Sequence, residues 1–283
     1  MKCLHRLDIL LAVILVLILA MGLALGCGDD DDDDDDNDAA DDDSGDDDDG
    51  DDDDDDNDDD TPPAPNAQLR TLHLGPNAGV VDVYLDASFE FVHGLDFTQG
   101  TTYAEIPAGD YALDIVPSDG DPATDGLLDA PLTLEPGVAY TAVFYGEILA
   151  DKEGSGLAAW LIVDDPGVAE DAANFILHLG HAADADTLEG MDVWSILGAP
   201  EDDTLLVDDF AYGGGEYLEL APGGYRIGID LDEDNTAYDL TFTTPDFVGG
   251  AQYNLFAVFS NPDTFLIAQL PDGDTTRIDP DVK

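Results

Sequence analysis

Val81-Asp82-Val83-Tyr84-Leu85-Asp86 decides the fold class, because its apolar side chains fall at every second position. A period of two is typical of a β-strand with one buried face. Residues 111–115 and 225–229 show the same alternation. Residues 140–145 and 253–259 are more continuously apolar, as expected of central strands covered on both sides. No stretch beyond the N-terminal segment keeps helical apolar spacing over three turns, so we expect an all-β chain.

Several sequence phrases occur twice in the same order, which indicates an internal repeat. Leu72-His73-Leu74-Gly75 aligns with Leu177-His178-Leu179-Gly180, and Val81-Asp82-Val83-Tyr84 aligns with Met191-Asp192-Val193-Trp194. Turns rich in Gly, Pro, Asp and Asn separate the short strands at roughly ten-residue spacing, which favours an antiparallel sandwich over a barrel. We therefore predict two β-sandwich repeats, at residues 67–166 and 167–283.

The first repeat contains His73, Val81-Asp82-Val83-Tyr84, Pro107-Ala108-Gly109-Asp110-Tyr111 and Gly137-Val138-Ala139-Tyr140-Thr141. In these phrases it resembles a known bacterial family, the domain of unknown function 4397. The second repeat keeps several of these residues, with Trp194 in place of the tyrosine. The resemblance implies two tandem immunoglobulin-like sandwiches, outside the cytoplasm and often lipid-anchored, with no activity assigned.

The N-terminal segment resembles a lipoprotein signal peptide at residues 1–26. Lys2 and Arg6 precede an apolar stretch that ends in Gly26-Cys27, where a lipoprotein would be cleaved and Cys27 lipidated. An uncleaved membrane helix is the alternative, because roughly 18 apolar residues approach the length that spans a bilayer. Both interpretations place the following residues outside the inner membrane. We expect a cell-envelope location, lipid-anchored and extracytoplasmic, at the outer membrane or the cell surface.

Residues 27–66 are predicted to be a disordered linker that begins at the lipidated cysteine. From Asp29 to Asp60 the chain is aspartate at all but seven positions. Such a tract has almost no apolar surface to bury, and its charges repel one another, so we expect an extended spacer. Cys3 would leave with the signal, which leaves no cysteine for a disulfide in the sandwiches.

The charge of the chain excludes nucleic acid as an expected partner. Residues 61–283 contain 41 acidic residues against five Lys and Arg, whereas nucleic-acid binding needs a cationic surface. No cofactor is predicted, and calcium is kept as the one candidate ion, through Asp230, Asp232 and Asp234 in an acidic loop. Asn235 and Thr241 occupy positions where an EF-hand needs Gly and Glu, so this would be a weak site of another kind.

Other candidate sites favour structural interpretations. His178 and His181 have the spacing of a zinc pair on a helix, but on a strand they need not converge, and we expect structural histidines bonded to a loop carbonyl. Trp160, Trp194 and Tyr212 could form a carbohydrate platform, although core packing also explains such aromatics. No nucleophilic triad, phosphate loop or carboxylate pair can be singled out, so no catalytic residue is predicted.

These observations predict a non-enzymatic surface lipoprotein that acts in binding, adhesion or envelope structure. Its membrane contact would be the lipid anchor, and its partner a protein or a glycan. Two alternatives stay open: a carbohydrate-binding or hydrolytic accessory protein, and a calcium-responsive surface spacer.

Overall fold

The computed structural model describes residues 64–148, 156–164, 169, 171–184, 190–197, 202–231 and 238–281. Every regular element in these residues is a β-strand, which confirms the all-β class. None of these residues forms a helix that is long and apolar enough to cross a membrane.

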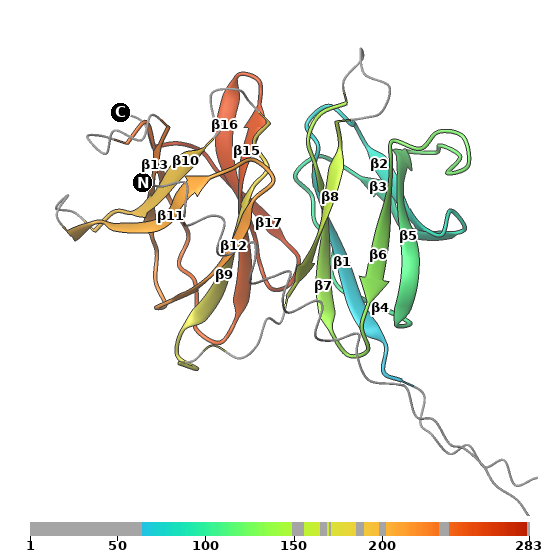
Figure 1. Ribbon diagram of the computed structural model, residues 1–283, viewed down its shortest axis with the longest axis horizontal. Helices are drawn as coiled ribbons and strands as arrows, with labels where there is room; N and C mark the ends of the chain where they lie inside the picture. Colours follow the sequence, from blue (N-terminus) through green and yellow to red (C-terminus); the bar gives the residue numbers. More distant parts are fainter. Residues whose placement is uncertain are drawn as a thin grey trace, which may run out of the picture. The chain divides into compact units, whose positions relative to one another are not determined.

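The first sandwich contains two four-stranded sheets (Figure 1). Its inner sheet, which faces the second sandwich, has the order β4 (Ala104–Ile106), β1 (Ala67–Leu74), β7 (Ala139–Tyr145), β8 (Ala158–Val163). Its outer sheet has the order β3 (Phe89–Leu95), β2 (Val81–Leu85), β5 (Gly109–Pro117), β6 (Leu128–Leu134). The core between them includes Val81, Val83 and Leu85, the apolar members of the alternating stretch.

The second sandwich repeats this arrangement. Its inner sheet has the order β12 (Gly215–Leu220), β9 (Phe175–His181), β15 (Gln252–Ser260), β16 (Asp263–Gln269), β17 (Thr275–Ile278). Its outer sheet has the order β11 (Thr204–Phe210), β10 (Met191–Ser195), β13 (Arg226–Asp230), β14 (Leu240–Thr243). Both sandwiches belong to one compact unit, Asp60–Lys283.

Each inner sheet contains both parallel and antiparallel pairs of strands, whereas the sequence predicted antiparallel sheets. β1 runs parallel to β7, and β9 runs parallel to β15. The first strand of each sandwich thus joins the sheet that holds its late central strand, although a long stretch of chain separates the two. Strand alternation in a sequence carries no information on direction, because parallel and antiparallel strands share the period of two.

The continuously apolar runs form central strands, as predicted. In β7, Tyr140, Ala142 and Phe144 enter the core of the first sandwich. Val143 and Tyr145 alternate with them and enter a separate cluster. β15 behaves in the same way, since it contributes to the second core and to that same cluster.

The strand registers fix how the two sandwiches correspond. Tyr140 of β7 and Tyr253 of β15 are the matching tyrosines of the repeat, and their partners on the first strands are Leu69 and Leu177. The first strands therefore match at an offset of 108 residues, and not at the offset of 105 that the sequence phrases suggested.

This register corrects the histidine alignment. His73 corresponds to His181, and His178 takes the position of Arg70. A shared contact supports the assignment, because the ring Nδ1 of each matching histidine accepts a hydrogen bond from the backbone two residues on, at 3.1 Å and 3.3 Å. The phrase Leu-His-Leu-Gly recurs, but with a different structural role in each copy.

Candidate functional site

The predicted calcium residues are only partly described. Asp230 ends β13, is buried, and lies opposite Asp192 of β10. Asp232 and Asp234 fall outside the described residues, and so does Cys27. The calcium loop and the lipid anchor therefore stay predictions.

His178 and His181 do not converge on one metal site. The ring of His178 contacts Phe256, which belongs to the cluster between the sandwiches, whereas the ring of His181 contacts Phe210 of the second core. The two imidazoles lie on opposite faces of β9, as a spacing of three residues requires in a strand. The Nδ1 atom of His178 is buried and has no hydrogen-bond partner among the described residues.

His73 is held in one orientation by the backbone. Its Nε2 lies 2.9 Å from the carbonyl oxygen of Gly79, and its Nδ1 accepts a hydrogen bond from Gly75. Burial lowers the pKa of His73 to about 4, against smaller opposing effects from the Gly79 carbonyl and Asp96. A neutral imidazole with its proton on Nε2 satisfies both contacts. The bond to a loop carbonyl that was expected of His178 and His181 is thus found at His73.

The two inner sheets pack face to face through a third apolar cluster. It combines side chains of β1, β7 and β8 with side chains of β15 and β16 and with Ala182, which follows β9. Its fully buried members include Leu72, Val143, Phe256 and Phe265. Trp160 adds a hydrogen bond across this contact, from its ring nitrogen to the carbonyl of Gly213 at 3.2 Å. Through this shared apolar cluster the two sandwiches pack tightly against each other.

A buried ion pair lies at the edge of this apolar contact. The Nε atom of Arg70, on β1, is 3.3 Å from an Oδ2 oxygen of Asp164, just after β8, and both side chains are almost fully buried. Thr141 accepts a hydrogen bond from Arg70 at 2.7 Å and donates one to Asp164. Tyr103 donates to the same carboxylate oxygen at 2.7 Å. Burial, followed by the charge of Asp164, raises the pKa of Tyr103 far above its usual value.

The second sandwich completes the surroundings of this ion pair. Arg70 donates a hydrogen bond across the contact to the carbonyl of Leu270 at 2.9 Å. The other carboxylate oxygen of Asp164 accepts from the side chains of Gln252 and Asn254 at 3.2 Å and 3.3 Å. A buried charge needs a counter-charge and hydrogen bonds, and here groups from both sandwiches supply them. The two sandwiches are therefore fixed by directional contacts as well as by apolar packing.

The three aromatic residues considered as a carbohydrate platform do not form one. Trp160 stacks on Tyr145 with ring centroids 3.9 Å apart, and Tyr212 packs edge-on against the same ring. Trp194 lies on β10 near Tyr238, away from this group. Core and contact packing thus account for these rings, as the structural interpretation predicted.

A cluster of metal-ligating groups lies on the outer sheet of the first sandwich, and sequence analysis missed it. Asp82 of β2 meets Glu90 and His93 of the neighbouring strand β3, and one ligand atom from each lies within 4.8 Å of the others. The signal available in the sequence was a carboxylate on one strand and a Glu-x-x-His on the next. It was hidden because spacing alone does not show which side chains face each other across a hairpin with a bulge.

Asp82 is the fixed member of this cluster. Its side chain is nearly inaccessible, and its two oxygens accept hydrogen bonds from the backbone N–H groups of Gly94 and Asp119, at 2.7 Å and 2.8 Å. Burial alone would raise the pKa of Asp82, but these two bonds and nearby His93 outweigh burial and lower it. The carboxylate is therefore held in its anionic form.

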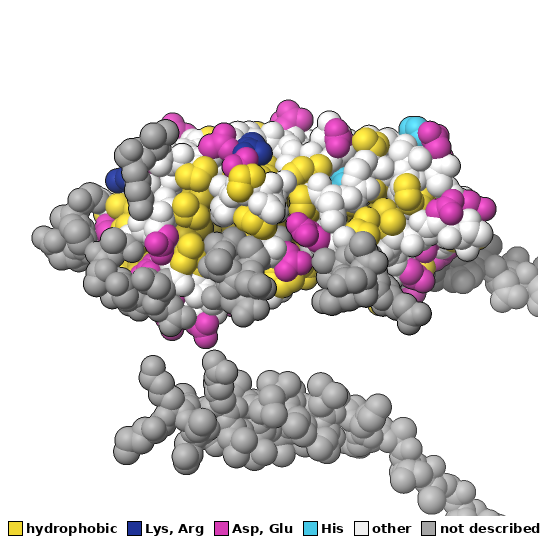
Figure 2. All heavy atoms as spheres, turned by 90° about the horizontal axis from the view of Figure 1, so that it is seen from above, with side chains coloured by type: hydrophobic (Ala, Val, Ile, Leu, Met, Phe, Trp, Pro, Cys, Tyr) yellow, Lys and Arg dark blue, Asp and Glu magenta, His cyan; other side chains and the backbone are white. Residues whose placement is uncertain are grey.

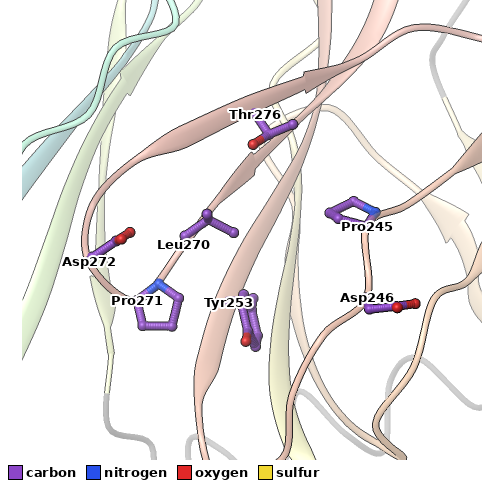
Figure 3. A pocket seen from close by; sticks show the side chains of 7 residues that line it. All are labelled: Pro245, Asp246, Tyr253, Leu270, Pro271, Asp272 and Thr276. Atoms are coloured by element: carbon purple, nitrogen blue, oxygen red, sulfur yellow. The ribbon is translucent and has the colours of Figure 1, made fainter.

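A pocket of about 390 Å³ opens at one end of the second sandwich (Figure 3). Its lining residues are Pro245, Asp246, Tyr253, Leu270, Pro271, Asp272 and Thr276. The Tyr253 ring lies between the Leu270–Pro271 side and the Pro245–Asp246 side, and its hydroxyl accepts a hydrogen bond from the backbone of Val248. The pocket combines apolar walls with two carboxylates, a mixture suited to a small polar ligand.

Acidic side chains are spread over the visible surface of the described residues, with few basic ones among them (Figure 2). Two of the described arginines, Arg226 and Arg277, form exposed ion pairs with nearby aspartates. The surface therefore presents an excess of negative charge.

The family model of DUF4397, a domain of unknown function, matches residues 67–193. This match supports the predicted domain family for that part of the chain. It covers the first sandwich and continues into the first strands of the second. No curated protein matches the sequence.

Two solved structures from Bacteroides ovatus ATCC 8483 are similar to this chain. One is a DUF3823 family protein, with 12% identity and a TM-score of 0.18, covering 66% of this chain and 100% of its own. The other is a "putative cell adhesion protein", with 11% identity and a TM-score of 0.22, covering 78% of this chain and 99% of its own. At these scores neither likeness carries an argument about this chain.

Proposed function

We propose that this chain is a cell-envelope lipoprotein, anchored through Cys27, that displays its two sandwiches outside the inner membrane as a non-catalytic binding or adhesion module. The observation that carries the proposal is the buried contact between the inner sheets, where Arg70 and Asp164 are enclosed by groups from both sandwiches. A rigid pair of domains on an acidic spacer suits display of a binding surface.

Three further features support this proposal. The ring nitrogens of His73 are both engaged by the backbone, so this imidazole serves the fold and not proton transfer. The matching registers of the two sandwiches support the finer proposal that the second one is another copy of the same domain. The excess of acidic residues makes a protein or glycan partner, and not a nucleic acid, the expected ligand.

The anchor is tested with the full-length chain expressed in a bacterium that makes lipoproteins. We expect fatty-acid labelling of the wild-type chain and its recovery with membranes, whereas Cys27→Ala should abolish the labelling. Protease added to intact cells should degrade the wild-type chain if it is exposed at the surface. A wild-type chain that takes no label would disprove the lipid anchor.

The adhesion role is tested separately on the same cells. Cells that display the wild-type chain should bind to a protein-coated or glycan-coated surface more strongly than cells that make the Cys27→Ala chain. Equal binding by both, with surface exposure of the wild-type chain established, would refute adhesion and leave the anchor standing.

The pocket favours glycan binding as a second candidate function. Its two carboxylates, Asp246 and Asp272, could accept hydrogen bonds from sugar hydroxyls beside the apolar walls. A saccharide array probed with the wild-type chain should then show a ligand whose signal falls at least tenfold in Asp246→Asn. An array without signal above the background would reject this candidate.

A further inference from the structure

We propose that Asp82, Glu90 and His93 form a binding site for a divalent first-row transition metal of the zinc class, on the outer sheet of the first sandwich. The Nδ1 atom of His93 lies 3.2 Å from Oδ1 of Asp82 and 3.0 Å from Oε1 of Glu90. A tetrahedral zinc ion with bonds of about 2.05 Å places its ligand atoms about 3.3 Å apart. Both distances from Nδ1 lie near that separation, and the three ligand atoms lie within 4.8 Å of one another.

The site combines one fixed ligand with two adjustable ones. Asp82 is held by the backbone of Gly94 and Asp119, which orients its carboxylate toward the hairpin. The side chains of His93 and Glu90 are 61% and 46% exposed, so both can move by the small amount that metal bonds require. Backbone groups that orient a ligating carboxylate are the outer contacts that metal sites depend on.

The second sandwich shows that the fold does not need Glu90 or His93. Its outer sheet has the same bulge, with register shifts at matching positions of β2–β3 and β10–β11. Tyr84 pairs with Glu90, and the matching Trp194 pairs with Leu205.

The matching carboxylate keeps its structural role without the other two ligands. Asp192 accepts a hydrogen bond from the backbone of Asp209 at 2.9 Å, as Asp82 does from Gly94. The position of His93 is taken by Asp208. The aspartate thus fastens the bulge in both sandwiches, whereas the histidine and glutamate occur in the first alone, where they meet at one point.

The donor set decides the class of metal. One imidazole nitrogen and two carboxylate oxygens suit zinc and its first-row neighbours, whereas calcium prefers six to eight oxygen ligands. Two carboxylates also balance the charge of a divalent ion. Because Glu90 and His93 face solvent, a fourth position stays open to water or to a donor group of a partner.

The test is a titration of the full chain with Zn²⁺ against a competing chelator, and with Co²⁺ followed by visible absorption. We expect one Co²⁺ per chain with the intense bands of a tetrahedral site. His93→Gln should lose these bands and bind Zn²⁺ at least tenfold more weakly, and Glu90→Gln should weaken binding in the same direction. Asp208→Asn, which removes a carboxylate at the matching position, should bind as the wild type does.

A gain-of-function variant distinguishes metal bound at this site from metal bound by the acidic spacer. Because it adds binding, its result cannot be explained by misfolding. Leu205→Glu with Asp208→His should raise the stoichiometry of tetrahedral Co²⁺ from one to two, because it recreates the ligand set around Asp192. Excess calcium should leave the bands unchanged. His93→Gln that binds Zn²⁺ as tightly as the wild type, or an absence of tetrahedral bands in every variant, would overturn the proposal.

Discussion

The two sandwiches share a frame but differ in the residues that face each other across their contact. Both use a tyrosine hydroxyl bonded to a carbonyl four residues earlier, from Tyr111 to Pro107 and from Tyr225 to Ala221. At matching positions of the inner sheets, however, the first sandwich has Arg70 where the second has His178.

This difference distinguishes the residues that maintain a single sandwich from the residues that hold the two sandwiches together. Contacts that occur in both sandwiches, such as the tyrosine hydroxyl bonds, maintain a single sandwich. Arg70 has no equivalent in the second sandwich, and its partners lie in both. Arg70 therefore belongs to the contact between the sandwiches, whereas the tyrosine hydroxyl bonds belong to each sandwich by itself.

The largest expected effect comes from breaking the buried ion pair. Arg70→Met leaves Asp164 buried without its counter-charge, which typically costs about 3–5 kcal/mol. We expect a loss of that size in the free energy of unfolding, measured by urea denaturation with fluorescence detection.

Arg226→Met is the matched control for this experiment. Arg226 pairs with Asp281 through side chains that are 54% and 30% exposed, and an exposed pair contributes at most about 1 kcal/mol. Equal losses for the two variants would show that the contact between the sandwiches does not depend on the Arg70 pair.

Acid should weaken the protein through its buried histidines. Burial lowers the pKa of His73 and of His178 to about 4, in the latter against a smaller raising effect of Asp164. A histidine with a lowered pKa contributes stability that is present above its unfolded pKa of about 6.5 and is lost as the pH falls toward 4. Each could contribute on the order of 2–3 kcal/mol across that window.

His178→Phe separates the two contributions, because phenylalanine keeps a ring against Tyr217 and Phe256. We expect its unfolding free energy to depend less steeply on pH between 7 and 5 than that of the wild type. An unchanged slope in His178→Phe would mean that this imidazole takes up its proton over the same pH range in the folded and the unfolded chain.

The sequence predicted the sandwiches but not their contact. Alternation at residues 81–86 and the apolar run at residues 140–145 depend on local burial, which a sequence shows directly. The partners Arg70 and Asp164 are far apart in the chain and carry no common motif, so only the fold brings them together. The repeated Leu-His-Leu-Gly phrase misled the alignment, since in β1 its histidine faces the opposite side of the sheet from its counterpart in β9.

A smaller effect is expected from adding a side chain at Gly180, on the face of β9 that meets Phe256 and Trp160. A Cβ atom at Gly180 would lie 2.4 Å from the Phe256 ring and 3.2 Å from Trp160. Overpacking of this kind costs about 1–3 kcal/mol. Gly180→Ala should lower the melting temperature and speed proteolysis between the sandwiches.

Gly126→Ala provides a control for that variant, because a Cβ atom there meets nothing within 4 Å. Its melting temperature should stay near the wild-type value. If Gly180→Ala melts at the same temperature as Gly126→Ala, the inner sheets have room to separate. The contact between them is then looser than its buried ion pair implies.

The smallest expected effect concerns the bulge in each of the two outer sheets. The bulge that Asp82 and Asp192 fasten needs a left-handed residue, which is Gly94 with φ 71° in the first sandwich and Asp209 with φ 51° in the second. Such a conformation costs a residue with a side chain about 1 kcal/mol, partly offset because glycine loses more chain entropy on folding. Asp209→Gly should therefore stabilise the chain by about 0.5 kcal/mol, whereas Gly94→Ala should destabilise it by a similar amount or more.

Calorimetric melts in a chelating buffer would measure both. Opposite signs would show that the two bulges share one backbone requirement, which the first sandwich meets with glycine and the second with a strained aspartate.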